Sequence, residues 1–362
     1  MNRLLILTFV TVLLSIIIFS LKKRTQAATI AAGKGLVLKK EWLAVNKSPL
    51  TPQKDCRPAD QTFLTFPEWF LVFSPEEQAN YFKQHTATSF AYMKHTAQIW
   101  QSYKIVKDQI KDNFPVNRGY HFMIWVIGAS ASVEYSMKAL YETLIGRITD
   151  THTVVTEEDK FNAVYTQDYV DFIKDRPWYE FDFKTRLKYL WKNVPFTGNH
   201  LTRKIERRYI LTSELLVKWG YGKLIGLGTK TVYDAALPTT AVVLDALPKN
   251  NASLQVAKQF PDNSVLVYLP RYDKFNAAAV EVAKGGSNFR EIAGNNTAIL
   301  LTILLPSADT TLFEHAQLVF KQPVASNLSM QRLALATPVT QLSSLLIQLD
   351  SLHIQIEHVF DY

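Results

Sequence analysis

The sequence EYSMKALYETLIGRIT at residues 134–149 returns 80 positions later as ELLVKWGYGKLIGLGT at residues 214–229. Seven of these sixteen positions are identical, in the pattern E-x3-K-x2-Y-x2-L-I-G-x2-T. Four more identities occur upstream at the same offset, between residues 94–115 and 174–195. Self-similarity at a fixed period indicates a repeated structural unit. We therefore predict a mostly α-helical domain with an internal duplication of about 80 residues, its units at about 74–151 and 155–235.

The repeat places three polar residues on one face of each predicted helix, because positions i, i+4 and i+7 lie above one another. The two rows are Glu134, Lys138 and Tyr141, and Glu214, Lys218 and Tyr221. One interpretation brings the rows together across a pseudo-twofold axis, as a polar pocket that binds an anionic head group or performs acid–base chemistry. The alternative is two structural Glu–Lys pairs, each worth a few tenths of a kcal/mol, with tyrosines packed beside them.

A membrane segment is predicted at the amino end. Residues 4–21, LLILTFVTVLLSIIIFSL, contain no charge and no proline. A helix of that length, at about 1.5 Å per residue, just crosses a bilayer core of about 30 Å. The run exceeds a usual signal-peptide core and is followed directly by Lys22, Lys23 and Arg24, so we expect a retained anchor in residues 1–24. Cleavage near residues 25–27 is the alternative.

The basic cluster after this run predicts membrane contact but leaves the orientation open. Lys22, Lys23 and Arg24 are candidate contacts for anionic lipid, or else simply a stop-transfer flank. The positive-inside rule favours a cytoplasmic body, whereas short amino-terminal anchors often export the domains downstream of them. We expect a single-pass protein of a bacterial inner membrane, with the side of the body unresolved.

Composition excludes several classes of protein. The chain has 362 residues, is 48% hydrophobic and 20% charged, and has a mean hydropathy of −0.03, which excludes a disordered chain and a polytopic transporter. Its formal charge is +8, but residues 1–40 hold seven of the 40 Lys and Arg and no acid. The remainder therefore has 33 basic and 32 acidic residues. Because the basicity belongs to one end, we expect no nucleic-acid partner.

Neither a metal nor a cofactor is expected. Cys56 is the single cysteine, which excludes an intrachain disulfide and a Cys-based zinc site, and no histidines have metal-ligand spacing. No nucleophile motif or phosphate-binding glycine loop is present, so the catalytic residues are unknown. A basic run contains candidate lipid- or phosphate-contacting residues, with a solvated helix face as the alternative: Arg203, Lys204, Arg207 and Arg208. Residues 120–133 are interpreted as a core helix, with an interfacial contact as the alternative.

The remaining chain divides into a tether and two domains. Residues 25–60 form a Pro-containing tether, residues 61–236 the duplicated helical domain, and residues 237–362 an α+β domain. Helix-start signals occur at Ser74-Pro75-Glu76-Glu77 and at Thr156-Glu157-Glu158-Asp159. In the last domain we predict strands at 239–244, 264–269, 289–293, 298–305, 318–320, 332–335 and 353–360, with helices at 273–284 and 340–351. This order suggests a ferredoxin-like sandwich.

These features predict a membrane-anchored binding or assembly factor, because an anchor, a tether and two globular modules occur without a recognisable catalytic set. Its expected partners are the membrane and either an anionic lipid or another protein. The alternative is an envelope enzyme that acts on a lipid-linked or anionic substrate through the paired Glu-Lys-Tyr rows. Whether the protein is an enzyme stays open from the sequence.

Overall fold

The computed structural model describes Trp42 and residues 48–150, 154–174, 176–229, 238–249, 254–309, 311 and 313–361. The predicted anchor, its basic cluster Lys22, Lys23 and Arg24, and most of the first part of the predicted tether lie outside these residues. No helix within the described ranges has both the length and the hydropathy needed to cross a membrane.

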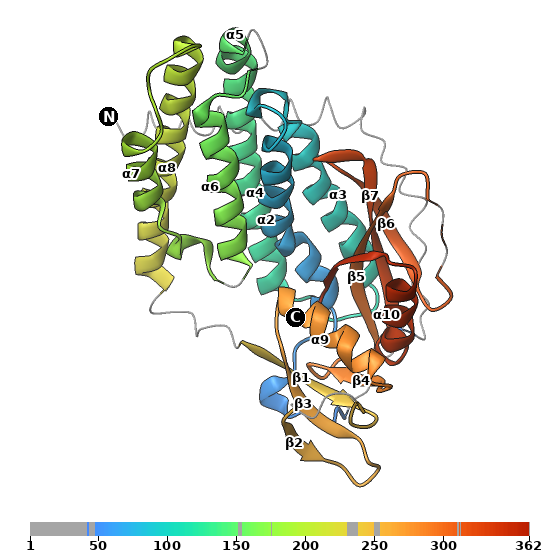
Figure 1. Cartoon of the computed structure of the whole chain (residues 1–362). Helices are drawn as coiled ribbons and strands as arrows, with labels where there is room; N and C mark the ends of the chain where they lie inside the picture. The colour runs from blue at the N-terminus through green and yellow to red at the C-terminus, as the bar shows by residue number, and fades with distance from the viewer. Residues whose placement is uncertain are drawn as a thin grey trace.

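A helical half is followed by a half with two antiparallel sheets, as the sequence predicts at this level (Figure 1). The longer helices of the first half are α2 (Gln61–Phe82), α3 (Tyr92–Ile110), α4 (Arg118–Tyr141), α6 (Glu157–Ile173), α7 (Phe183–Lys192) and α8 (Leu201–Thr229). Shorter turns are η2 (Gln53–Asp55), η3 (Ala87–Ser89), the π-helical η4 (Glu142–Gly146), α5 (Arg147–Thr149) and η5 (Trp178–Glu180).

The central helix α2 begins earlier than its sequence signals indicate. Ser74 and Pro75 have the pattern of a helix start, but α2 runs through both and through Pro67. Six of its seven aromatic residues are buried, because α2 packs against α3, α4, α6 and strand β5. A helix that is apolar all round has no amphipathic period to reveal it. The second start signal is confirmed, since Thr156 and Asp159 form a capping box at the start of α6.

The carboxy-terminal half contains two four-stranded antiparallel sheets, ordered β2-β3-β1-β4 and β6-β7-β5-β8. The first comprises β1 (Thr239–Leu244), β2 (Val256–Gln259), β3 (Val265–Pro270) and β4 (Phe289–Ile292), and the second comprises β5 (Ala298–Pro306), β6 (Gln317–Val324), β7 (Asn327–Pro338) and β8 (Gln355–Val359). Each has a helix between its third and fourth strands, α9 (Asp273–Lys284) or α10 (Leu342–Ser351), and a short η6 (Val339–Gln341) precedes α10. The two halves of this domain thus repeat one connectivity.

This arrangement differs from the expected ferredoxin-like sandwich. Each four-stranded unit has one helix in its described part, and β1 and β3 pair antiparallel, as do β5 and β7. The predicted strands are all present, and β2 is an additional strand that the sequence pattern does not indicate. All four residues of β2 are exposed, so this edge strand has no buried face and carries no hydrophobic alternation.

The end of the predicted tether contacts the first sheet. The backbone N–H groups of Leu50 and Thr51 each donate to the Glu291 carboxylate at 2.9 Å, and the Thr51 hydroxyl does so at 2.8 Å. The Arg57 N–H donates to the carbonyl of Ala293 at 2.8 Å. These bonds hold residues 50–57 on strand β4 and the turn after it.

A buried ion triad joins the two halves of the molecule. Arg332 on β7 donates from Nη2 to Glu77 of α2 at 2.8 Å, and from Nε and Nη2 to Glu357 of β8 at 2.6 and 2.7 Å. Its guanidinium also lies over the Phe73 ring, 4.8 Å from the centroid. Burial opposes the charge on Arg332, but Glu357 and Glu77 outweigh it and raise the Arg332 pKa. Arg332 therefore keeps its charge, and its hydrogen bonds fix α2 on the second sheet.

The variant Arg332→Met should lower the unfolding free energy by about 3–5 kcal/mol, because it leaves the buried carboxylates of Glu77 and Glu357 without their cation. Urea denaturation of the full chain measures this change. The matched control is Arg290→Met, because its partner Asp262 is exposed. The unfolding free energy of this control should stay close to that of the wild type. Equal losses in the two variants would contradict the assignment.

Candidate functional site

The structure brings four of the six repeated polar residues into a closed ring between α4 and α8. The Nζ of Lys138 lies 3.0 Å from the Glu134 carboxylate and 3.1 Å from that of Glu214. The Nζ of Lys218 lies 2.9 Å from Glu214 and 3.3 Å from Glu134. Each ammonium therefore bridges one carboxylate on its own helix and one on the other helix, and the ring has no net charge.

The two helices that hold the ring run antiparallel. Lys138, Glu142 and Gly146 follow one another along α4 and η4. Their partners Glu214, Arg207 and Arg203 have descending residue numbers along α8. Within each helix the i, i+4 spacing keeps Glu and Lys on one face. The glutamate of each row therefore lies opposite the lysine of the other row, an arrangement that a pseudo-twofold axis through the ring would produce.

All four ring residues are held in their charged forms. Burial opposes ionisation of Glu134, but Lys218 and Lys138 outweigh it and lower the Glu134 pKa to about 2. The Glu214 pKa is lowered for the same reasons, by Lys138 and Lys218 against burial. The pKa of each lysine is raised, because the two carboxylates outweigh the burial that opposes its charge. No member of the ring is therefore poised to exchange a proton near neutral pH.

The two repeated tyrosines do not join the ring. The Tyr141 hydroxyl donates to the backbone carbonyl of Glu206 at 3.4 Å, while Tyr221 is 46% exposed and stacks on Trp178 with ring centroids 5.4 Å apart. Tyr165 and Tyr169 of α6 lie beside the ring instead. Lys218 lies 5.1 Å from the centre of the Tyr169 ring, and the buried Tyr165 hydroxyl has no hydrogen-bond partner among the described residues.

Burial is the main cause of the raised pKa of both α6 tyrosines, and the Tyr169 value reaches about 12. Both phenols therefore stay neutral beside the ring. Sequence reasoning missed this pair, although its i, i+4 spacing on a helix with a clear start was a usable signal.

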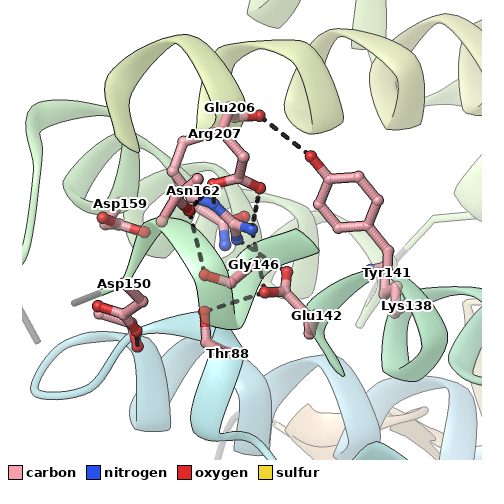
Figure 2. Close-up of polar contacts among 12 residues, drawn as sticks. Thr88, Lys138, Tyr141, Glu142, Gly146, Asp150, Asp159, Asn162, Glu206 and Arg207 are labelled. Carbon is pink, nitrogen blue, oxygen red and sulfur yellow. Dashed lines mark hydrogen bonds and ion pairs between the residues drawn. The ribbon is translucent and has the colours of Figure 1, made fainter. Parts of the chain in front are cut away.

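Next to the ring, the basic run of α8 forms a buried ion network with remote carboxylates. Figure 2 shows Arg207 between Glu142 and Glu206. Its Nη1 and Nη2 donate to the two Glu142 oxygens at 2.8 and 3.0 Å, and its Nε donates to Glu206 at 2.7 Å. Arg203 donates to the Gly146 carbonyl and to Glu206, each at 3.2 Å. These contacts connect α8 to the end of α4.

This burial differs from both expectations for the run, a lipid- or phosphate-contacting surface and a solvated face. Arg203, Lys204, Arg207 and Arg208 have only 2–5% of their surface exposed. Arg208 donates to Glu158 at 2.7 Å and to the Val194 carbonyl at 2.9 Å, and Lys204 donates to the Thr197 carbonyl at 2.9 Å. The physical reason is that buried charges need partners, and α6, η4 and the α7–α8 loop supply them.

The π-helical turn η4 depends on its glycine. An added Cβ at Gly146 would lie 2.1 Å from Glu142 Oε2 and 3.1 Å from Arg207 Nη2. The equivalent Gly226 is less constrained, since its Cβ would have Tyr179 Cδ2 as the nearest atom, at 3.8 Å. Both glycines lie in helical segments of the chain, Gly146 in η4 and Gly226 in α8.

A cleft of about 1700 Å³ runs beside the ring. Its walls come from α2, α4, α6, η5 and α8, and residues just before and at the start of α9 contribute to its lining. The lining is mainly apolar and aromatic and includes Trp69, Phe70, Met123, Val126, Ile127, Tyr165, Tyr169, Trp178, Tyr179, Tyr221 and Ile225. Charged side chains from the ends of these elements also line it: Glu68, Lys174, Arg176, Glu180, Lys223, Arg271 and Lys274. The size and the lining of the cleft suit a molecule with an apolar body.

No protein-family model matches the chain, and comparison with curated proteins and with solved structures also finds no match. Within the part of the chain that the structure describes, no group of three or more His, Cys, Asp and Glu is arranged to hold a metal ion. The geometry of the ring, the network and the cleft therefore carries the functional argument.

The variant Gly146→Ala should lower the unfolding free energy by about 1–3 kcal/mol, because the methyl group displaces the Glu142 carboxylate from Arg207. Gly226→Ala is the matched control at the equivalent repeat position. It should be neutral or stabilising by up to about 1 kcal/mol, since alanine favours the helix. Chemical denaturation compares them, and a similar loss in both would rule out the steric explanation.

The ring should also produce a pH dependence. Because the folded-state pKa values of Glu134 and Glu214 are lowered, their contribution to stability is full above their ordinary value of about 4.5 and is lost as pH falls toward about 2. Replacing the ring with Glu134→Gln, Lys138→Met, Glu214→Gln and Lys218→Met leaves no unpaired charge. Unfolding free energy measured from neutral to acid pH should fall less steeply in this variant than in the wild type. Parallel curves would be the contradicting result.

Proposed function

We propose that this protein is a membrane-anchored binding protein that holds an amphipathic, lipid-class molecule in the cleft between α4 and α8. The observation that carries the proposal is the cleft itself, its volume of about 1700 Å³ and its mainly apolar lining. Pockets for compact small molecules measure about 300–1000 Å³, so this cleft exceeds what a compact ligand fills. An acyl chain fits a large space walled by aromatic and aliphatic side chains.

The charges of the lining support an anionic head group. Besides the neutral ring and the Arg207–Glu142 pair, the lining has five cations and two acids. The cations are Lys174, Arg176, Lys223, Arg271 and Lys274, and the acids are Glu68 and Glu180. Lys174 pairs with Glu76 at 3.0 Å. The excess of positive charge favours a negatively charged group near the ends of α6 and α8 and the start of α9.

The charge states of the ring favour binding over catalysis. An envelope enzyme that used the paired rows would need a group able to give or take a proton near its working pH. The lowered carboxylate pKa values and raised lysine pKa values support a structural part for the ring instead, as the spacer that holds the cleft open. Anchoring through residues 1–24 at a bacterial inner membrane, on either side, and a protein partner that receives the ligand belong to the same proposal.

Binding of a fluorophore-labelled lysophosphatidylglycerol to the full chain in detergent tests the proposal. Ser130 lines the cleft from the exposed side of α4, so Ser130→Trp should fill part of it and weaken binding at least about tenfold. Gly119→Trp is the matched control on the same helix, outside the cleft, where an added Cβ meets nothing within 4 Å. It should bind as the wild type does.

Two results would overturn the cleft assignment. One is equal affinity of the wild type and Ser130→Trp, which would place the probe elsewhere on the protein. The other is a wild type that shows no saturable binding. Circular dichroism of each variant verifies that the helices remain folded.

A further inference from the structure

The outer sides of α4 and α8 carry two long rows of exposed apolar residues. The first row, on α4 and its continuation through α5, consists of Phe122, Trp125, Val126, Met137, Leu140, Leu144 and Ile148, which are 43–73% exposed. The second row, on α8, consists of Leu201, Ile205, Tyr209, Leu216, Val217 and Leu224, which are 45–69% exposed. Exposed apolar surface of this extent marks an interaction site rather than ordinary surface scatter.

The rows occupy equivalent positions of the repeat. Trp125, Met137 and Leu144 are each 80 residues from Ile205, Val217 and Leu224, respectively. On each helix the row lies opposite the side that faces the protein core, and the ring residues lie between the two. Because the helices are antiparallel and their ring residues face each other, both rows lie on the same side of the pair. Val126 of the α4 row also lines the cleft, so the cleft borders this face.

We propose that this face, the row of α4 together with the row of α8, rests on the surface of a lipid bilayer that contains anionic lipid. Trp125 and Tyr209 in the rows favour this placement, since Trp and Tyr are the side chains enriched at membrane interfaces. Trp191 on α7 extends the aromatic surface, because its Nε1 donates to Thr212 of α8 at 3.1 Å, between the levels of Tyr209 and Leu216.

The charge at the edges of the face also complements an anionic bilayer. Exposed cations adjoin the rows: Arg118 at the start of α4, Arg147 beside Ile148, Lys223 beside Leu224, and Lys188 and Lys192 on α7 next to Trp191. Each cation near an anionic leaflet adds about 1 kcal/mol to binding. An apolar face with a basic rim is the pattern of helices that lie in the interface plane.

The same rim argues against a second copy of the chain as the occupant. A twofold interface through this face would bring two equal cationic rims near each other, at a cost in like-charge repulsion. An anionic leaflet instead neutralises the rim and covers the two rows at once. This inference builds on the membrane part of the proposed function. It brings the cleft, which Val126 of the α4 row lines, next to lipid, the source of an amphipathic ligand.

Nitroxide accessibility in the full chain tests the orientation. In a Cys56→Ser background, a spin label is attached at Leu140→Cys on the α4 row, at Leu216→Cys on the α8 row, or at the control Leu328→Cys, a 77% exposed residue at the start of β7. The protein is reconstituted in vesicles of phosphatidylcholine and phosphatidylglycerol. Labels on the two rows should collide with oxygen and be shielded from a water-soluble nickel complex, whereas the control label should stay open to the nickel complex.

The three labelled chains have the same amino-terminal segment, so anchoring by that segment alone cannot produce the difference. Lys188→Gln combined with Lys192→Gln should reduce the shielding of both row labels toward the level found in phosphatidylcholine alone. Row labels as open to nickel as the control label would overturn the proposal. Row labels that broaden each other between two chains in place of gaining oxygen contact would also overturn it, in favour of a second copy.

Lipid binding in detergent separates this proposal from the proposed function. Row labels in water with intact probe binding would refute only the membrane-facing orientation. Row labels in lipid without saturable probe binding would refute only the cleft assignment.

Discussion

The arrangement of α4 and α8 depends on the need of buried charges for partners. Arg203 and Arg207 are almost completely buried, and an unpaired ion at that depth would cost several kcal/mol. Glu142, Glu206 and the Gly146 carbonyl accept hydrogen bonds from these two arginines. These bonds fix the first part of α8 against the turn after α4. Farther along, the Glu134–Lys138–Glu214–Lys218 ring continues the same antiparallel alignment. Long ionic side chains thus hold these two helices together, as aliphatic packing does in an ordinary helical bundle.

That choice of contact has a structural consequence. Ionic side chains reach across a wider gap than interdigitated leucines, so the helices can remain paired while the space beside the ring stays open as a cleft. The aromatic residues of α6 and η5 form one wall of the cleft and leave its interior open. Because the ring has no net charge, and its carboxylates stay deprotonated while its lysines stay protonated, it braces the helices without imposing a charge on the occupant of the cleft. The outward rows of both helices are then free to meet an apolar environment.

The sheet half supports this bundle from one end. The Arg332 triad fixes α2 on the second sheet, and α2 in turn packs against α3, α4 and α6. Residues 270–274, between β3 and the start of α9, contribute lining to the cleft, so its end is built by the carboxy-terminal half. A change in the packing of the two halves would therefore alter the cleft as well as the stability of the fold.

Local pattern alone determined much of this protein: the helical half and the half with sheets, the face that Glu134 shares with Lys138 and Glu214 with Lys218, the α6 start at Thr156, and every strand with a buried side. Those features are encoded by residues a few positions apart in the chain. The tertiary structure decided the rest: that the basic run of α8 is buried, that Tyr165 and Tyr169 replace Tyr141 and Tyr221 beside the ring, and that an apolar side of α4 is exposed. A helical pattern specifies which residues share a face, but which element covers that face depends on partners distant in the chain.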